Sequence, residues 1–409
     1  MGEWGIKKLN ELGKIVNGST PERNNPEFWK NGTIPWATPT DITDCKGRVI
    51  NKTKERITIK GLKSCSTKLL PVGSILLTSR ATIGEMKINS IEMCTNQGFK
   101  NIVVNDENHN WFVFYLLGFN KNKLNALGNG STFKEVSKKD IGNLEFWIPL
   151  VKIEQSKIAE ILTTIDDAVE KTEKIIAKYK HIKQGLMQDL LTKGIDEHGN
   201  IRSESTHKFK DSPLGRIPVE WEVKSCSSLI KLTSGKPKTR KQLENEKEFL
   251  YPVYGGNGVT GYSQMPLVNF PTLIIGRVGE YCGNTLFVDK PCWVTDNALY
   301  IYECDNNFNL KFYNYYFNYI GLGNFSSKTG QPLITQSIIK EIQVAIPSIY
   351  EQERITQIIE ATEKVINEEI RYFNKLNSVK QGLMNDLLTG KVRVMHLLDK
   401  GGESGECHP

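Results

Sequence analysis

The sequence contains no apolar run close to the about 18 residues that a membrane-spanning helix needs. Its first residues, MGEWGIKKLNELG, lack the apolar core of a secretory signal peptide. The eight cysteines include no CxxC pair, and no histidine cluster accompanies them, which argues against a structural zinc site or a disulfide framework. These absences predict a cytoplasmic protein whose cysteines are free thiols.

Motifs of enzymes that act on nucleic acids are also missing. The chain has no GxxxxGK(S/T) phosphate loop, no HExxH zinc motif and no Asn/Asp-Pro-Pro-aromatic tetrapeptide. The net charge of +7 permits nucleic-acid binding but does not prove it. We therefore expect a non-catalytic chain with no metal and no cofactor of its own. A self-sufficient DNA-modifying enzyme is the alternative that a methyl-transfer assay on the chain alone would test.

A ten-residue block occurs twice in the chain. Residues 183–192 read KQGLMQDLLT and residues 380–389 read KQGLMNDLLT, which agree at nine of ten positions and lie 197 residues apart. The same offset relates Glu154-Gln155 to Glu351-Gln352 upstream. The chain therefore consists of two halves that end alike.

Each copy of this block ends a long amphipathic segment with a heptad pattern. The stretch from 154 to 191 covers 38 residues, which as one helix would be about 57 Å long at about 1.5 Å per residue. A single apolar stripe of that length needs a partner, so we predict that the two helices pair within the chain. The alternative is that the two segments are ordinary core helices of two globular domains. The predicted seams are Ile158, Ile161, Ile165, Ala168, Ile175, Tyr179, Ile182 and Leu186, and Ile355, Ile358, Val365, Tyr372, Leu376, Val379 and Leu383, with a flanking row Ile359, Ile366 and Phe373.

The two halves also begin alike. Trp4 precedes Gly18 by fourteen residues, and Trp221 precedes Gly235 by the same number. The offset between the halves is 217 at these starts and 197 at the ends, so the second insert is shorter and differs in sequence. Apolar strands that follow Pro71 and Pro271, and aromatic helices near 111–117 and 312–317, predict two small α/β domains, each inserted before a long helix.

The predicted fold class is α+β or mixed α/β, with two small globular domains, two long paired coiled-coil helices and an internal pseudo-two-fold repeat. The expected boundaries are a first domain at 1–147, a long helix at 148–193, a polar linker at 194–217, a second domain at 218–345, a second long helix at 346–394 and a disordered tail at 395–409.

These repeats carry a family resemblance. Ile148-Pro149 and Ile346-Pro347 each lead to Glu-Gln and then to a helix that ends in the KQGLM block. In this the chain resembles, over nearly its whole length, the DNA-specificity subunit of type I restriction-modification enzymes. The first copy departs by one extra residue between Pro149 and Glu154, which we expect to shift the start of its helix slightly.

The resemblance implies a non-catalytic subunit with two target-recognition domains that read the two halves of a split DNA target. The helices would act as a ruler that fixes the unread spacer. They would also dock two modification (methyltransferase) subunits, which bind S-adenosylmethionine, and restriction (translocase-nuclease) subunits would join later. A coiled-coil scaffold protein is a further alternative, but it leaves the two differing inserts unexplained.

Candidate DNA contacts come from polar loops and from a basic stretch after the second domain start. Five positive charges, beginning at Lys231, fall within eleven residues without an acid, which predicts a phosphate-contacting loop; a solvated charged loop is the alternative. Tyr254 and Asn257 flank a glycine-rich loop that could approach a ligand, although an unliganded turn would look the same. The predicted DNA-binding residues are Ser19, Thr20, Thr38, Thr40, Ser79, Arg80, Asn96, Gln97, Lys236, Lys238, Arg240, Lys241, Tyr254, Asn257, Arg277 and Asn297.

The ends of the two long helices are more apolar than a heptad seam requires, which predicts docking of another chain there. The predicted docking residues are Leu186, Met187, Leu190, Leu191, Leu383, Met384, Leu387 and Leu388. The aromatic side chains of the two short helices are predicted to be core instead: Phe112, Phe114, Tyr115, Phe312 and Tyr316.

Overall fold

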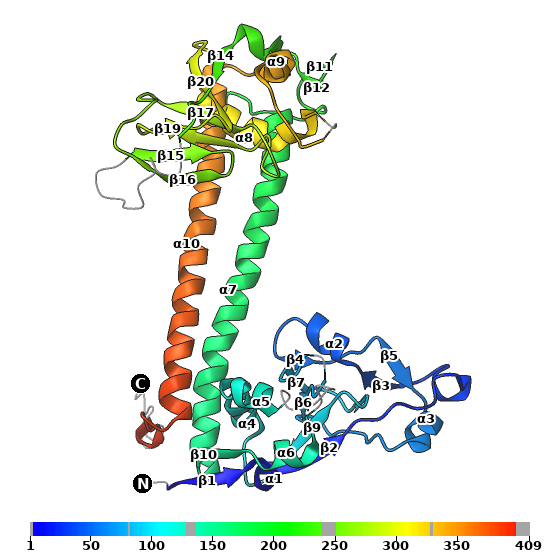
Figure 1. The fold of residues 1–409 in the computed structure, drawn as a ribbon. Coiled ribbons are helices and arrows are strands. Elements are labelled where there is room, and N and C mark those ends of the chain that lie inside the picture. The colour runs from blue at the N-terminus through cyan, green and yellow to red at the C-terminus, as the bar shows by residue number, and fades with distance from the viewer. Residues whose placement is uncertain (1–2, 81, 128–135, 239–250, 328–329, 398–409) are drawn as a thin grey trace, which may run out of the picture. The chain divides into compact units, whose positions relative to one another are not determined.

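A computed structural model describes residues 3–80, 82–127, 136–238, 251–327 and 330–397, and it divides into two compact units (Figure 1). Unit 1 comprises residues 1–174 and 371–409, and unit 2 comprises residues 175–370. Each unit therefore contains one globular domain and a part of both long helices. This division cuts through the helices, unlike the sequential division expected from the sequence.

The globular domain of unit 1 contains two sheets. The larger has the strand order β2-β9-β6-β7-β4, and the smaller has the order β5-β3-β8. Their strands are β2 (Gly13–Asn17), β3 (Ile34–Ala37), β4 (Val49–Ile50), β5 (Glu55–Ile57), β6 (Ile75–Leu77), β7 (Met86–Asn89), β8 (Cys94–Thr95) and β9 (Lys100–Val104). The helices are α1 (Leu9–Leu12), α2 (Pro39–Asp44), α3 (Ile59–Ser64), α4 (Asn110–Phe119), α5 (Lys121–Leu127) and α6 (Lys138–Gly142).

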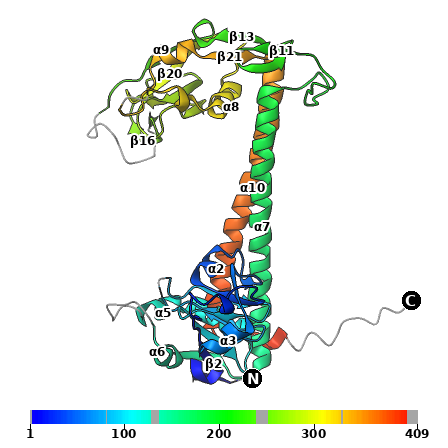
Figure 2. The ribbon, with the colours of Figure 1, turned by 90° about the vertical axis from the view of Figure 1, so that its right-hand side faces the viewer.

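The globular domain of unit 2 repeats this topology although its sequence differs. Its sheets have the orders β14-β20-β17-β18 and β16-β15-β19, which match β2-β9-β6-β7 and β5-β3-β8. Figures 1 and 2 show each globular domain from two directions. The strands are β14 (Ile230–Ser234), β15 (Tyr251–Gly255), β16 (Gly258–Ser263), β17 (Thr272–Gly276), β18 (Thr285–Val288), β19 (Trp293–Val294) and β20 (Ala298–Cys304). The duplication therefore extends through the inserts, where the sequence shows no repeat.

The aromatic helices α4 and α8 (Leu310–Ile320) pack as expected from the sequence. Phe112, Tyr115, Phe312 and Tyr316 are buried in the two main apolar clusters, and Phe114 packs against the first cluster. These side chains dominate the domain cores because each removes a large apolar area from water. The prediction that they are core residues is confirmed.

The two long helices, α7 (Lys152–Thr192) and α10 (Ile349–Leu388), pair in antiparallel fashion within each unit. In unit 1, Lys380 Nζ lies 2.7 Å from Asp166 Oδ1, and in unit 2, Lys183 Nζ lies 2.6 Å from Glu363 Oε1. The two pairs are equivalent in the repeat, since Lys183 and Lys380 open the two KQGLM blocks. The predicted pairing of the helices is confirmed, and the repeated lysine forms one of the ion pairs between them.

A tyrosine from the aromatic helix joins each of these pairs. Tyr115 Oη donates to Asp166 Oδ2 at 2.9 Å, and Tyr315 Oη donates to Glu363 Oε2 at 2.6 Å. Burial is the main reason why the pKa of each phenol lies above its usual range, so both stay protonated donors. Each globular domain is thereby tied to the helix pair through one shared carboxylate.

The heptad seam differs in part from the one expected. Ile182, Tyr372 and Val379 are exposed by 40%, 51% and 43%, although the sequence places them on the seam. The buried positions include Leu162 and Ile176 on α7, and Ile359 and Ile366 from the flanking row on α10. A heptad count shows that an apolar stripe exists, but the other helix decides which of its rows is covered.

The glutamates of the Glu-Gln signature are buried acceptors. Glu351 accepts hydrogen bonds from Trp221 Nε1 at 3.1 Å and from Ile195 N at 2.9 Å, and it forms an ion pair with Arg202. In unit 1, Glu154 accepts from Trp4 Nε1 at 3.4 Å and pairs with Arg393 at 2.7 Å. The Trp at each domain start is thus hydrogen-bonded to the signature glutamate at the start of a long helix, Glu154 in unit 1 and Glu351 in unit 2.

The glutamines of the signature bind the segment before each aromatic helix. Gln155 Oε1 accepts from His109 N, and Gln352 Oε1 accepts from Asn309 N, both at 2.9 Å. Each Nε2 donates at 2.9 Å to the proline carbonyl of the Ile-Pro pair. Both long helices begin two residues before their Glu, so α7 begins three residues after Pro149 whereas α10 begins two residues after Pro347. The expected slight shift of the first helix start is confirmed.

The segment expected to be a linker, 194–217, is largely structured. It contains β11 (Phe209–Ser212), which pairs with β12 (Gly215–Pro218), and its Ile217 packs with Trp221 and Ala345. These two strands lie beside the ribbon of β13 (Glu222–Ser225) and β21 (Gln343–Ile346). In the equivalent ribbon of unit 1, β1 (Trp4–Lys8) pairs with β10 (Glu145–Pro149). Of the expected tail, 395–397 form a short helix, and the remainder lies outside the described residues.

The cysteines within the described ranges are free thiols. Burial raises the pKa of Cys94 and Cys226 to about 12 and that of Cys292 to about 11. At pH 8 the thiolate fraction at a pKa of 12 is about 1 in 10⁴, against about 1 in 4 for an ordinary thiol.

We therefore expect iodoacetamide at pH 8 to leave Cys94, Cys226 and Cys292 unmodified in the folded protein and to alkylate them after denaturation. Peptide mass spectrometry of matched native and denatured samples measures this directly. Equal labelling rates for Cys226 in the two samples would contradict the buried position that the fold gives it.

Candidate nucleic-acid interface

Loops from four strands meet at one edge of the domain in unit 1. Ser19 N donates to Thr95 O at 2.9 Å, and Ser79 N donates to Gly98 O at 2.8 Å. Asn96 N donates to Ala37 O at 3.0 Å, which brings the end of β3 to the same place. Predicted DNA-binding residues that are distant in the sequence therefore lie together.

The side chains on these loops differ in what they can offer a ligand. Gln97 is exposed and accepts a hydrogen bond from the Thr20 hydroxyl, and Thr40 and Arg80 are exposed as well. Thr38 is the N-cap residue of α2, and its hydroxyl donates to Asp41 at 2.6 Å. Asn96 Oδ1 accepts from Gly98 N, so this side chain stabilises the turn between β8 and β9.

Ser79 does not present its side chain at this edge. It is fully buried, and its hydroxyl lies 3.4 Å from Lys100 Nζ. A side chain enclosed in this way cannot contact a base edge, so the predicted reading role of Ser79 is corrected to one of loop support. Its position directly after a buried apolar strand is consistent with this enclosure.

The same backbone hydrogen bonds recur in unit 2. Lys236 N donates to Val294 O at 2.9 Å, Arg277 N donates to Asn297 O at 3.0 Å, and Thr295 N donates to Tyr254 O at 2.9 Å. Lys236 is thus equivalent to Ser19, and Arg277 to Ser79. One backbone frame therefore carries different side chains in the two units.

The predicted residues of unit 2 surround this frame. Lys236, Asn257 and Asn297 are exposed, and a Cβ at Gly256 would lie 3.2 Å from Asn297 O, so the glycine-rich loop reaches the same edge. Arg277 is half-buried, and its Nη1 donates to Ser234 Oγ at 3.3 Å. Arg240 and Lys241 lie outside the described residues. Lys231, from the same basic stretch, is paired with Glu303 at 2.8 Å on a strand.

Sequence reasoning missed four residues at these edges. The Arg23 guanidinium lies 4.2 Å from the ring centre of Trp29 and 4.7 Å from that of Trp36. Lys238 Nζ, which was predicted, lies 3.9 Å from the ring centre of Trp293, which was not. In unit 1 the sequence shows a basic residue near two tryptophans, whereas Lys238 and Trp293 lie far apart in the sequence and are brought together only by strand pairing.

The predicted docking residues at the helix ends lie in the core of the chain itself. Leu190 and Leu191 belong to the apolar cluster of unit 2, and Leu186 and Met187 pack against it. Met384, Leu387 and Leu388 belong to the cluster of unit 1, with Leu383 packed against them. The extra apolar surface is buried because the end of each long helix packs on a globular domain. The prediction of an exposed docking surface there is wrong.

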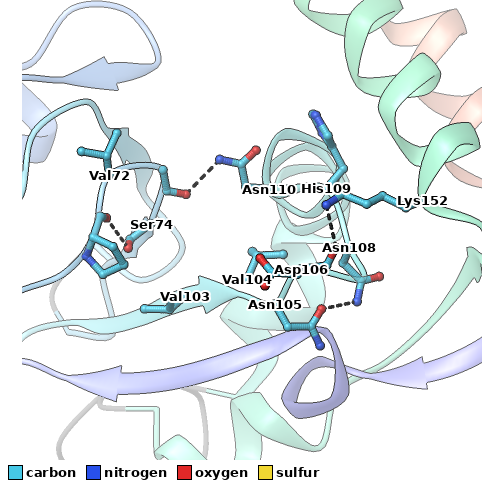
Figure 3. A pocket seen from close by; sticks show the side chains of 12 residues that line it. Val72, Ser74, Val103, Val104, Asn105, Asp106, Asn108, His109, Asn110 and Lys152 are labelled. Carbon is cyan, nitrogen blue, oxygen red and sulfur yellow. Dashed lines mark hydrogen bonds between the residues drawn. The ribbon is translucent and has the colours of Figure 1, made fainter.

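A polar cavity lies beside the start of α4 in unit 1 (Figure 3). Lys152 Nζ donates to Asp106 O at 2.6 Å, and Asn110 Nδ2 donates to Gly73 O at 3.1 Å. Burial, and to a smaller degree the charge of Lys152, lower the pKa of His109. The predicted DNA-binding residues do not line this cavity, and amide and backbone groups make up most of its wall. The cavity therefore lies apart from the candidate interface.

The described part of the chain contains neither a membrane-spanning helix nor a cluster of metal-binding side chains. None of its helices is both long and apolar enough to cross a bilayer. Within the same ranges, no group of three or more His, Cys, Asp or Glu side chains is arranged to hold a metal ion.

Comparison with known sequences identifies related proteins. The family described as Type I restriction modification DNA specificity domain matches residues 1–180 and 218–380. The specificity subunit of type I restriction enzyme MjaIX from Methanocaldococcus jannaschii is 32% identical over 252 residues, which are 60% of this chain and 56% of that subunit. The specificity subunit of EcoprrI from Escherichia coli is 25% identical over 372 residues, 89% of this chain and 88% of that subunit.

Solved structures share the fold. The type I restriction-modification S subunit from M. genitalium superposes with a TM-score of 0.64 at 17% identity, covering 95% of this chain and 96% of that one. A chain from a study of complex assembly and conformational transition of the type I R-M system has a TM-score of 0.56 at 16% identity, covering 95% and 98%. At these identities the likeness concerns the fold, and it confirms the predicted architecture.

Proposed function

This chain belongs to the family of type I restriction-modification DNA specificity subunits, and we propose that it reads a bipartite DNA target with one loop edge in each unit. The observation that carries the proposal is the repeated frame of backbone hydrogen bonds at the two edges. Because Lys236 stands where unit 1 has Ser19, and Arg277 stands where unit 1 has the enclosed Ser79, the two frames would present different groups to DNA. Two different half-sequences are the expected target.

Charge and side-chain chemistry support this assignment. Lys236, Lys238 and Arg277 give the edge in unit 2 cations for phosphates or guanine. The edge in unit 1 has Arg23 and Arg80 for the same purpose, and Thr20 and Gln97 add neutral donors and acceptors.

The internal repeat also bears on the partners. Two equivalent halves in one chain offer equivalent surfaces to two copies of one partner, as the two subunits of a homodimer would. We propose that these partners are two modification subunits, which carry S-adenosylmethionine and the methyl-transfer chemistry, and that restriction subunits join the complex. The chain itself would be non-catalytic and would act in the cytoplasm.

Sequencing of methylated DNA from a host that expresses this chain with its modification subunit tests the proposal. The expected result is one bipartite motif with two defined half-sequences and an unread spacer. A host that expresses the modification subunit without this chain is the control and should show no such motif.

The purified chain alone should transfer no methyl group from S-adenosylmethionine to that DNA. A contiguous motif, or methyl transfer by the chain alone, would contradict the proposal and favour a self-sufficient enzyme.

A further inference from the structure

At both edges a loop begins directly after a glycine, Gly18 or Gly235, that follows the first strand of the larger sheet. A Cβ at Gly18 would lie 1.8 Å from Asn96 O, and one at Gly235 would lie 2.2 Å from Val294 O. No side chain fits at those distances, so each loop leaves its sheet pressed against the neighbouring turn. The next residue, Ser19 or Lys236, makes the repeated backbone hydrogen bond described above.

The carbonyl of that next residue accepts a hydrogen bond from an indole in both units. Trp36 Nε1 donates to Ser19 O at 3.0 Å, and Trp293 Nε1 donates to Lys236 O at 3.0 Å. The backbone N–H and C=O of this residue are therefore both bonded, the N–H to a strand carbonyl and the C=O to a tryptophan.

The two tryptophans come from different strands. Trp36 lies on β3 and pairs with Cys94, whereas Trp293 lies on β19 and pairs with Val253. These strands form the same parallel pair in the two domains, so the indole has changed strand while its hydrogen bond is retained. An alignment of the two halves would not match these residues, and the recurrence of the contact is geometric.

A cation from the same loop lies over each indole. The Arg23 guanidinium covers Trp36, and Lys238 Nζ covers Trp293 at the distances given above. Arg23 is also paired with Glu55, and Lys238 Nζ donates to Ser263 Oγ at 2.5 Å. Each indole ring thus binds the cation at the end of the loop through a cation–π contact, and its N–H donates to the carbonyl at the beginning of the loop.

We infer that Trp36 and Trp293 are the positioning residues of two DNA-reading loops, 18–23 and 235–238, and that each controls recognition of one half of the target. This inference rests on the proposed function. Because the loop carbonyl and the cation are already fixed, the loop loses less conformational entropy when it binds DNA. Each tryptophan therefore acts on specificity through its loop, without touching DNA itself.

The test uses Trp36→Phe and Trp293→Phe in the full chain assembled with its modification subunits. Phenylalanine keeps an aromatic face but removes the N–H donor. The probes are duplexes that carry the motif mapped for the wild-type complex, and duplexes with one base pair replaced in either half. Fluorescence anisotropy gives the ratio of affinities for intact and altered DNA, separately for each half.

We expect W36F to reduce this ratio about tenfold, equivalent to ~1.4 kcal/mol, for one half only, and W293F to reduce it similarly for the other half. Trp4→Phe and Trp221→Phe are matched controls, since each loses an indole hydrogen bond to a helix glutamate away from the loops. These controls should lower thermal stability and leave both ratios unchanged.

Unchanged ratios, or equal losses in both halves, would overturn the inference while leaving the proposed function intact. A wild-type complex without sequence preference would overturn the proposed function and this inference together. If W36F does not fold because Trp36 is fully buried, the half-buried Trp293 provides the decisive variant.

Discussion

Replacement of Glu351 with alanine is expected to lower the free energy of unfolding by about 3–5 kcal/mol, the cost of breaking a buried ion pair by removal of one partner. Glu351 is 6% exposed, and its carboxylate satisfies the Arg202 guanidinium, the Trp221 indole and the Ile195 amide. Without it the Arg202 charge remains buried and unpaired. A guanidinium chloride titration followed by tryptophan fluorescence measures the loss.

Two further variants make this experiment specific. Glu353→Ala changes an exposed residue on the same helix and should alter stability by no more than ~0.5 kcal/mol. The double variant E351A/R202L removes the stranded charge together with its partner, so it should recover part of the loss. A loss below ~1 kcal/mol for E351A would show that this carboxylate does not hold the domain start to α10.

The second large effect is expected from shortening both long helices by one heptad. Removal of residues 171–177 together with 369–375 keeps the pairs Asp166–Lys380 and Lys183–Glu363, because these lie on either side of the deleted segments. Seven residues remove about 10 Å of helix, nearly two turns, so the packed faces remain almost aligned. We expect the methylated motif to keep both half-sequences and to lose at most about three base pairs of its spacer.

The experiment depends on deleting the facing heptads of both helices together. Removal of 171–177 alone shifts α7 against α10, so at most one of the two lysine–carboxylate pairs can form. That variant should lose methylation instead of changing the spacer. Methylated-motif sequencing distinguishes the outcomes, and altered half-sequences in the matched variant would refute the idea that the helices set the spacer.

Several features could be predicted from the sequence because they depend on local or repeated patterns. The KQGLM blocks, the Glu-Gln pairs and the Trp-to-Gly spacing defined two halves, two long helices and two inserted domains. Strand ends followed by polar residues located Gln97 and Arg277 near the loop edges that the structure brings together. Patterns of this kind report what a residue does within its own helix or strand.

Other features depended on contacts between distant segments. Leu190 and Met384 seemed available to another chain, but each packs on a globular domain of this chain. Arg202 and Arg393 occupy equivalent roles beside Glu351 and Glu154 although the segments around them differ in length.

The sequence by itself thus determined the duplication, the helices, the family and the approximate location of the reading loops. Only the tertiary structure decided which apolar rows are buried, that the two inserts share one topology, and that Trp36 and Trp293 hold equivalent carbonyls from different strands. The physical reason is that periodicity records that a helix or strand has an apolar face, which needs a partner. The identity of that partner is fixed by strand pairing and packing between residues far apart in the chain.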